Sequence, residues 1–91
     1  MQITWDEDKN ESNFQIHGIW FEEILNVLFD PLTLFNQNKH TDRNRFEYLG
    51  LSEKLDLLYV ITVEKDESTI RVISARKATL RERKGYEEKE N

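Results

Sequence analysis

Residues 57–63 read LLYVITV, and this segment constrains the fold more than any other part of the chain. Its side chains are apolar at both odd and even positions, which is typical of a central strand that is covered on each face. RFEYLGL at residues 45–51 precedes it, and TIRVISA at residues 69–75 follows it after a short polar loop at residues 64–68. Because consecutive strands joined by short turns usually pair, we expect an antiparallel sheet with residues 57–63 near its centre.

The chain begins with residues 2–5 (QITW), which alternate polar and apolar side chains as an opening edge strand would. Asp6 follows this strand and can cap the first turn of a short polar helix. His17 and Gly18 would end that helix, because glycine readily takes the left-handed conformation of a C-cap. We therefore expect a strand and a polar helix before residue 19.

A second helix is predicted over residues 21–28, where apolar side chains recur at the i, i+3, i+4 and i+7 positions. Asp30 and Pro31 end it, because the residue before a proline avoids the helical conformation. We expect the apolar face of this helix to pack against the central strand. That face consists of Phe21, Ile24, Leu25 and Leu28.

A last helix is predicted near the C-terminus. Thr79 and Glu82 stand in the T-x-x-E relation of a capping box, which would open it. We expect Gly85 to interrupt and so weaken this helix, since glycine is a poor helix former. Leu80 and Tyr86 offer its main apolar contacts, so we expect the helix to depend on docking to another surface.

The remaining elements complete the predicted order. Leu32 and Leu34 alternate with polar residues as a further strand would, and residues 36–44 form a polar turn. The resulting order is β-α-α-β-β-β-β-α, an α+β fold in which helices flank an antiparallel sheet. With 91 residues and 11.0 kDa, the chain has room for one core, and we expect a single domain over residues 1–91.

The charge of the chain is unevenly distributed. Its net charge is −5, but residues 1–42 carry −6, whereas residues 71–84 hold six basic side chains against Glu82 alone. Such a balance disfavours indiscriminate binding of nucleic acid, although the basic segment could hold a few phosphates or an acidic partner. A solvated surface laced with ion pairs explains the same pattern.

The composition also limits the location of the protein and the kinds of site it can hold. There is no cysteine, which excludes disulfides and thiolate chemistry and fits a reducing cytoplasm. The N-terminus lacks a signal sequence and no apolar run is long enough to cross a bilayer, so we expect a cytoplasmic protein. His17 and His40 are isolated and no phosphate-binding glycine loop occurs, so we expect neither a metal nor another cofactor.

Arginines inside predicted strands are the main candidates for a functional site. Arg45, Arg71 and Arg76 could gather on one sheet face and hold a phosphodiester through two-pronged hydrogen bonds. Arg71 and Arg76 are five residues apart, so a regular strand would direct their side chains to opposite faces of the sheet. They can lie on the same face only if Arg76 lies past the end of its strand. The alternative is that Arg71 and Arg76 form structural salt bridges with Glu47, Glu64 or Glu82.

Proton transfer and base stacking have weaker candidates. His17 titrates near neutral pH and could move protons, although a histidine at a helix end can simply cap carbonyl groups. The aromatic side chains of Trp5, Trp20, Phe21 and Tyr59 are more simply explained as core residues than as platforms for bases.

Three stretches of the chain resemble the BrnT family of type II toxins, in the order of that family. Residues 3–23 (ITWDEDKNESNFQIHGIWFEE) resemble its opening, and DP at residues 30–31 followed by RFEYLG at residues 45–50 continues the likeness. Residues 71–87 (RVISARKATLRERKGYE) are similar to its most distinctive segment. Each stretch is weak evidence alone, whereas the combination is specific and covers nearly the whole chain.

The resemblance implies a RelE-like fold and a metal-independent ribonuclease that cleaves RNA by acid–base chemistry. It also implies neutralisation by a ribbon-helix-helix antitoxin of the BrnA kind, which binds operator DNA and makes the toxin a corepressor. In such an enzyme Arg45, Arg71 and Arg76 would stabilise charge on the phosphate in the transition state. His17 or Glu47 would handle protons.

One position departs from the family pattern. The family usually reads Lys-His-Gly before the second helix, whereas this chain has Ile16 before His17 and Gly18. Two alternatives to a ribonuclease therefore stay open. One is a catalytically degenerate relative that only binds its antitoxin and acts as a corepressor, and the other is a small sheet domain whose arginines are purely structural.

Overall fold

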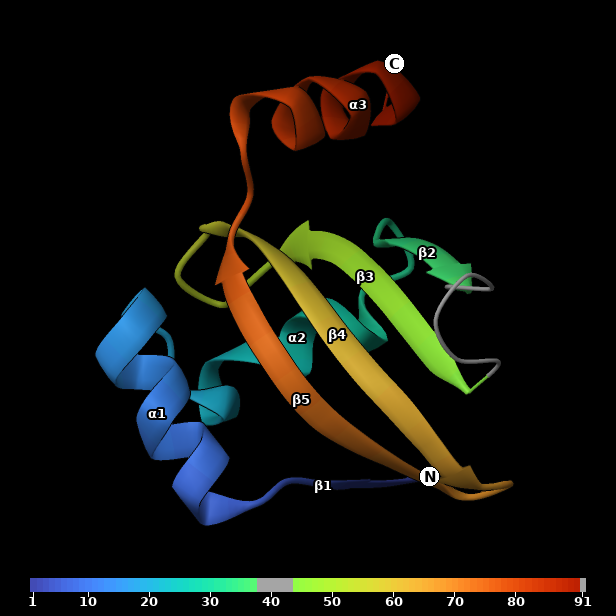
Figure 1. Ribbon diagram of the computed structural model, residues 1–91. Coiled ribbons are helices and arrows are strands. Elements are labelled where there is room, and N and C mark those ends of the chain that lie inside the picture. Colours follow the sequence, from blue (N-terminus) through green and yellow to red (C-terminus); the bar gives the residue numbers. More distant parts are fainter. Residues whose placement is uncertain (38–43, 91) are drawn as a thin grey trace.

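A computed structural model describes residues 1–37 and 44–90 (Figure 1). Its sheet has five strands in the order β1-β5-β4-β3-β2, so β4 is central, as residues 57–63 predicted. Residues 38–43, which make up most of the polar turn expected over residues 36–44, lie outside the described residues. The strands are β1 (Gln2–Thr4), β2 (Leu34–Gln37), β3 (Arg45–Leu51), β4 (Leu57–Asp66) and β5 (Thr69–Lys77).

The element order agrees with the predicted order, and the α+β fold class is confirmed. One pairing differs from the expectation of a wholly antiparallel sheet, because β1 runs parallel to β5. The polar helix that follows β1 lies alongside β5, and the alternation of residues 2–5 carries no information about strand direction. The other three pairings in the sheet are antiparallel.

Four helical segments accompany the sheet, and within the described ranges none is long and apolar enough to cross a membrane. The caps of the first are confirmed: the Asp6 carboxylate accepts hydrogen bonds from the backbone N–H groups of Asp8 and Lys9, and Gly18 has a φ of 74°. The segments are α1 (Glu7–His17), the 3₁₀ helix η1 (Phe21–Ile24), α2 (Leu25–Phe29) and α3 (Leu80–Glu90).

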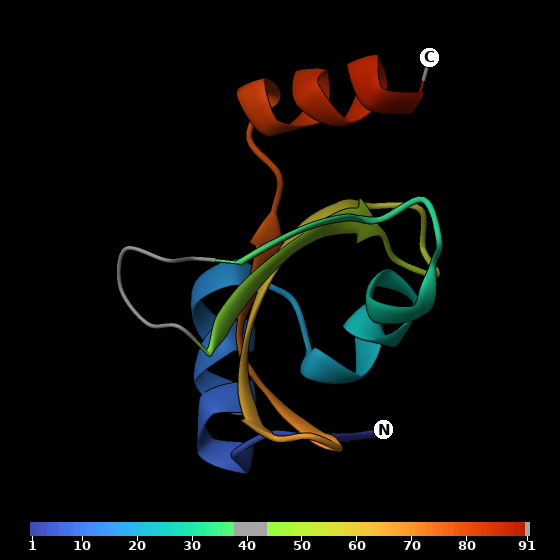
Figure 2. The same cartoon turned by 90° about the vertical axis from the view of Figure 1, so that its right-hand side faces the viewer.

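The core lies between the sheet and the η1–α2 segment, which sits behind the sheet in Figure 1 and on its concave side in Figure 2. Leu25 is not part of this core, contrary to expectation, because 37 % of it is exposed. The reason is the 3₁₀ turn, which has three residues per turn and directs inward the residues spaced by three. These are Phe21, Ile24 and Val27, each fully buried.

Two buried asparagines attach α1 to the rest of the molecule. The Asn13 side chain donates a hydrogen bond to the carbonyl oxygen of Ala75 (2.8 Å) and accepts one from the N–H of the same residue (3.1 Å). It thereby continues the pairing of the β5 edge beyond the short strand β1. Asn10 accepts a hydrogen bond from the N–H of Phe21 (2.7 Å) and fixes the start of η1.

Helix α3 begins with the predicted capping box. The N–H of Glu82 donates to Thr79 Oγ1 (3.1 Å), and the N–H of Thr79 donates to Glu82 Oε1 (2.9 Å). The helix continues through Gly85 instead of being interrupted there. Tyr86 is buried as expected, but Leu80 is 86 % exposed, so it does not supply the apolar contact expected of it.

Candidate active site

The face of the sheet opposite η1 and α2 carries the sequence-predicted arginines and Glu47, and it is the face seen from the front in Figure 1. Because neither η1 nor α2 packs on it, we call it the uncovered face. Strand pairing arranges its side chains in three rows that cross the sheet. The tyrosine row consists of Leu34, Leu49, Tyr59 and Arg76; the carboxylate row of Asn36, Glu47, Ile61 and Ser74; and the arginine row of Arg45, Val63 and Arg71.

A bulge in β5 places both of its arginines on this face. Pairing with β4 changes from Ile61–Ser74 to Thr62–Val72, which leaves Ile73 as an extra residue. An extra residue in one strand reverses the side-chain alternation beyond it. Arg76 therefore shares a face with Arg71 while still inside β5, and the expectation that Arg76 had to lie past the strand end is wrong.

Arg45 and Arg71 lie on either side of Val63, so about 10 Å separates their Cα atoms. Arg71 is exposed, and neither arginine belongs to a salt bridge within the part of the chain that the structure describes. Arg45 Nε is buried and has no hydrogen-bond partner among those residues. Native proteins seldom leave such a group unpaired, which makes the arginine row unlike a structural ion pair.

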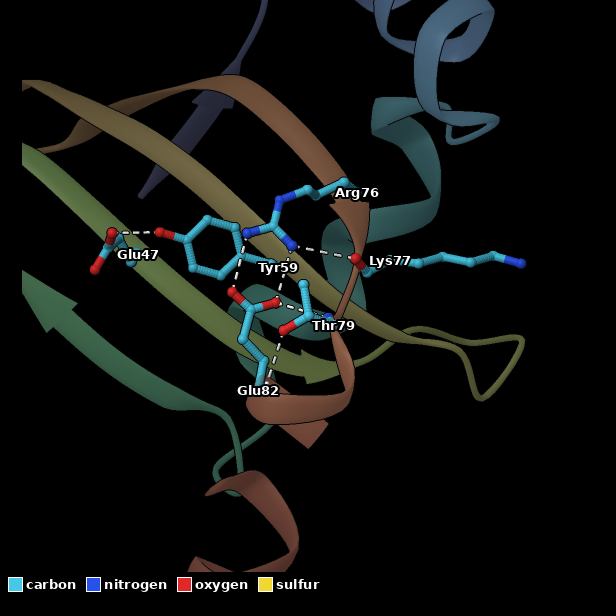
Figure 3. A network of polar contacts seen from close by, with 6 residues as sticks. All are labelled: Glu47, Tyr59, Arg76, Lys77, Thr79 and Glu82. Atoms are coloured by element: carbon cyan, nitrogen blue, oxygen red, sulfur yellow. Dashed lines mark hydrogen bonds and ion pairs between the residues drawn. The ribbon is translucent and has the colours of Figure 1, made fainter. Parts of the chain in front are cut away.

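Arg76 has a different environment, shown in Figure 3. Its Nη1 and Nη2 atoms donate to the two carboxylate oxygens of Glu82, both at 2.9 Å, and Nη1 also donates to the carbonyl oxygen of Lys77 (3.2 Å). The guanidinium lies 4.3 Å from the centre of the Tyr59 ring. The salt-bridge alternative raised from the sequence therefore holds for Arg76 and Glu82.

This ion pair shifts the titration of both of its members. The two-pronged hydrogen bond from Arg76 lowers the pKa of Glu82, and the same bond raises the pKa of Arg76.

Along β4, about 13 Å separates the tyrosine row from the arginine row. The structure thus places all three arginines on one face, brings Arg45 and Arg71 into one row, and leaves Arg76 in another.

Tyr59 connects Glu47 with Arg76. Its hydroxyl donates a hydrogen bond to Glu47 Oε1, and one face of its ring lies under the Arg76 guanidinium (Figure 3). Burial raises the pKa of Tyr59, and the hydrogen bond to Glu47 raises it further, so the phenol keeps its proton. The sequence interpretation treated Tyr59 as a core residue and missed this connection, although its polar tip within a central strand was a possible signal.

The two candidates for proton transfer are far apart. Glu47 lies in β3 at the centre of the uncovered face, between the tyrosine and arginine rows. His17 is exposed in the last turn of α1, which lies against β5. Since β4 and β5 lie between β3 and α1, at least about 10 Å separates the backbones of His17 and Glu47.

The described residues include no group of three or more His, Cys, Asp or Glu side chains placed to hold a metal ion.

A family model described as "Ribonuclease toxin, BrnT, of type II toxin-antitoxin system" matches residues 5–82. The chain belongs to the BrnT family. It is also similar to the ribonuclease toxin BrnT of Brucella abortus, known from a 1.1 Å crystal structure, with 29 % identity and a TM-score of 0.73. The match covers 87 % of this chain and 97 % of the Brucella chain. No curated protein matches the sequence.

Family membership confirms the resemblance seen in the sequence and agrees with the fold class. It places the chain in a family of ribonuclease toxins of type II toxin–antitoxin systems, and membership in such a family implies an antitoxin partner. The matched region contains all three rows of the uncovered face.

Proposed function

We propose that this BrnT-family protein cleaves RNA on the uncovered face of its sheet, with the arginine row as the phosphate-binding element. The observation that carries the proposal is the placement of Arg45 and Arg71 one row from the carboxylate of Glu47. Neither arginine has an ion-pair partner among residues 1–37 and 44–90. Two unpaired guanidiniums beside a carboxylate suit a phosphodiester that must be bound and attacked.

Glu47 is the proposed general base. The ribose 2′-oxygen attacks the adjacent phosphorus and forms a new P–O bond, while its proton passes to the Glu47 carboxylate. The bond from phosphorus to the 5′-oxygen breaks, and the departing oxygen takes a proton from solvent on the open face. The products are a 2′,3′-cyclic phosphate and a 5′-hydroxyl, and the fixed charges of Arg45 and Arg71 stabilise the negative charge that develops on the phosphate.

Tyr59 and Arg76 are proposed as positioning residues. The Tyr59 hydroxyl donates a hydrogen bond to one oxygen of Glu47, and the Arg76 guanidinium packs on the Tyr59 ring. Glu82 neutralises the charge of Arg76. This assignment moves Arg76 from phosphate binding to support of the site. His17 was the first candidate for proton transfer and stays a testable one, since only a variant can decide between it and Glu47.

The test combines product chemistry with metal removal. Purified protein and a 5′-labelled RNA oligonucleotide should yield fragments that end in a 2′,3′-cyclic phosphate, identified by mass spectrometry. The rate should not change in excess chelator, because the proposed steps use only side chains of this chain. Glu47→Gln should lower the cleavage rate strongly, whereas His17→Ala should have little effect. The opposite result would identify His17, and not Glu47, as the general base.

We also propose that the antitoxin is a ribbon-helix-helix protein of the BrnA kind and that operator DNA is bound only through it. The basic, exposed surface of α3 is the proposed docking site, because Arg81, Arg83 and Lys84 lie beside the exposed Leu80. The free protein should exchange amide hydrogens faster in residues 80–89 than in β4 and β5. Antitoxin should slow the exchange in α3, and an unchanged pattern would place the interface elsewhere. A cytoplasmic location remains part of the same proposal.

The alternative is a protein that keeps the fold and binds only its antitoxin. The observation that favours it is Ile16, which replaces a lysine usual in the family and is 74 % exposed on α1. If the parent protein cleaves no RNA, Ile16→Lys decides between the two. Cleavage gained by that variant would identify a degenerate nuclease, and continued inactivity would support a binding module.

A further inference from the structure

Asn36 lies directly opposite Glu47 in the pairing of β2 with β3. Directly opposed side chains of an antiparallel pair share one face of the sheet, with their Cβ atoms about 5 Å apart. The Asn36 amide therefore stands beside the Glu47 carboxylate on the uncovered face. Both residues also line one depression of that face, so a single bound molecule can contact the two side chains together.

The Asn36 side chain is unpaired among residues 1–37 and 44–90. Asn36 is exposed, and no hydrogen bond links its side chain to another residue in these ranges. The buried asparagines differ, since Asn10 and Asn13 both bond to backbone groups. Asparagine is also depleted in strands, so pairing of β2 does not explain its presence. The two N–H groups of the Asn36 amide are therefore available to a ligand.

The Glu47 carboxylate has one oxygen in use and one free among the described residues. Oε1 accepts the hydrogen bond of Tyr59, whereas Oε2 accepts none. An ionised carboxylate only accepts hydrogen bonds, so Oε2 suits the proton of a hydroxyl group. The oxygen of that hydroxyl keeps two lone pairs, and an adjacent amide N–H group can donate to one of them. Glu47 and Asn36 together therefore match a hydroxyl group, which both donates and accepts.

We propose that Asn36 binds the ribose of the substrate, with its side-chain amide donating a hydrogen bond to the 2′-oxygen that attacks the phosphorus. The inference rests on the proposed ribonuclease function and adds a residue to its site. Glu47 takes the 2′-hydroxyl proton on Oε2, and the hydrogen bond from Asn36 strengthens as negative charge develops on the oxygen. Arg45, two residues from Glu47 along β3, holds the following phosphate. The contact also distinguishes RNA from DNA, which lacks this oxygen.

Cleavage rates of two variants test the contact. Asn36→Ala should lower the single-turnover rate about tenfold, as the loss of one hydrogen bond predicts. Its unfolding midpoint should not change, because no bond within the described residues is lost. Ser74→Ala is the matched control and should keep the parent rate, because Ser74 lies in the same row but two strands from Glu47. A parent rate for folded Asn36→Ala, or an equal loss in both variants, would overturn the proposal.

Nucleotide binding tests whether Asn36 contacts the 2′-oxygen itself. Adenosine 3′-monophosphate and its 2′-deoxy counterpart differ in that oxygen alone, and both offer a phosphate to the arginine row. The parent should bind the ribonucleotide more tightly in NMR titrations, and this preference should fall about fivefold in Asn36→Ala but not in Ser74→Ala. The side-chain amide resonance of Asn36, identified by its absence from the variant, should shift more with the ribonucleotide. If Asn36→Ala weakens both nucleotides equally, or if neither binds the parent, the ribose assignment is wrong.

Binding and cleavage together separate this inference from the proposed function. If the parent cleaves no RNA but its preference for the ribonucleotide depends on Asn36, the ribonuclease proposal fails and the ribose assignment stands. If RNA is cleaved and Asn36→Ala keeps both the parent rate and the parent preference, the ribose assignment fails alone.

Discussion

Arg45 and Arg71 lie opposite the same residue of the central strand, Val63, although 26 positions separate them in the sequence. Arg45 comes from β3 and Arg71 from β5, so each guanidinium extends from a different strand toward one surface. Neither is neutralised by a carboxylate among the described residues. Two like charges held at this spacing favour an anion between or above them, which is the basis of the proposed phosphate site.

Removal of either arginine should weaken RNA binding in a salt-dependent way. The logarithm of the RNA-binding constant falls linearly with the logarithm of the salt concentration. Each phosphate contact to a single strand adds about 0.7 to the steepness of this line. Arg45→Ala and Arg71→Ala should each reduce the slope by about that amount in fluorescence-anisotropy titrations at several salt concentrations. Lys54→Ala removes an equal charge from the β3–β4 loop, where Lys54 pairs with Glu23, and an equal loss of slope there would indicate only a net-charge effect.

The η1–α2 segment offers a neighbouring pair of residues with opposite expectations. Ile24→Ala should lower the free energy of unfolding by about 2–5 kcal/mol, because Ile24 is fully buried. Leu25→Ala should cost less than about 1 kcal/mol, because Leu25 is 37 % exposed. Urea denaturation of both variants tests the 3₁₀ turn directly. A larger loss of unfolding free energy for Leu25→Ala than for Ile24→Ala would indicate the regular helix that the sequence predicted.

Gly50 in β3 should not tolerate a side chain. A Cβ atom there would lie 2.2 Å from Thr33 Oγ1 and 3.0 Å from Thr33 Cβ, so Gly50→Ala should cost about 1–3 kcal/mol of stability. The matched control is Gly85→Ala in α3, where nothing lies within 4 Å and a gain of about 0.5–1 kcal/mol is expected. Adding Thr33→Ala to Gly50→Ala should recover part of the lost stability. If the double variant instead loses the sum of the two single losses, the clash with Thr33 is not the cause.

The Arg76–Glu82 pair should make stability depend on pH in the acid range. Glu82 has a lowered pKa in the folded protein, mainly because Arg76 donates two hydrogen bonds to it, so the unfolded chain binds its proton more readily. The contribution is present above the unfolded value of about 4.5 and is lost as pH falls below that value through the lower folded pKa. The stability difference between the parent and Glu82→Gln should therefore shrink from pH 6 to pH 3, and a constant difference would contradict the pairing.

Local sequence signals predicted much of the fold because the responsible forces act over a few residues. Asp6, Gly18 and the Thr79–Glu82 capping box each satisfy backbone groups in their own turn, and the structure confirms all three. The apolar pattern of residues 57–63 predicted the central strand correctly, but the expected cover on both faces is wrong. Leu58, Val60 and Thr62 are buried, whereas Tyr59, Ile61 and Val63 on the other face are partly exposed. The result is a correct element order and a correct central strand.

The features that the sequence did not reveal depend on contacts between distant segments. Ile73 looks like an ordinary strand residue, and only its pairing with β4 shows the bulge that turns Arg76 to the face of Arg71. The three-residue spacing of Phe21, Ile24 and Val27 competes with the four-residue spacing of Phe21 and Leu25, and tertiary packing decides between them. Asn13 carries no periodic signal at all, since its role is to pair with the edge of β5.

The most direct test of the proposed ribonuclease site is the single-turnover cleavage rate of Arg71→Ala, normalised to the fraction of folded protein. Arg71 is exposed and unpaired within the described part of the chain, so its loss should leave the unfolding midpoint unchanged. Lys77→Ala is the matched control, because Lys77 is an exposed cation in the same strand that pairs with Leu58 on the other face. The account predicts that Arg71→Ala lowers the rate by about 100- to 1000-fold and that Arg71→Lys restores little of it, while Lys77→Ala keeps the parent rate. Cleavage by folded Arg71→Ala at the parent rate would contradict the arginine row as the phosphate site.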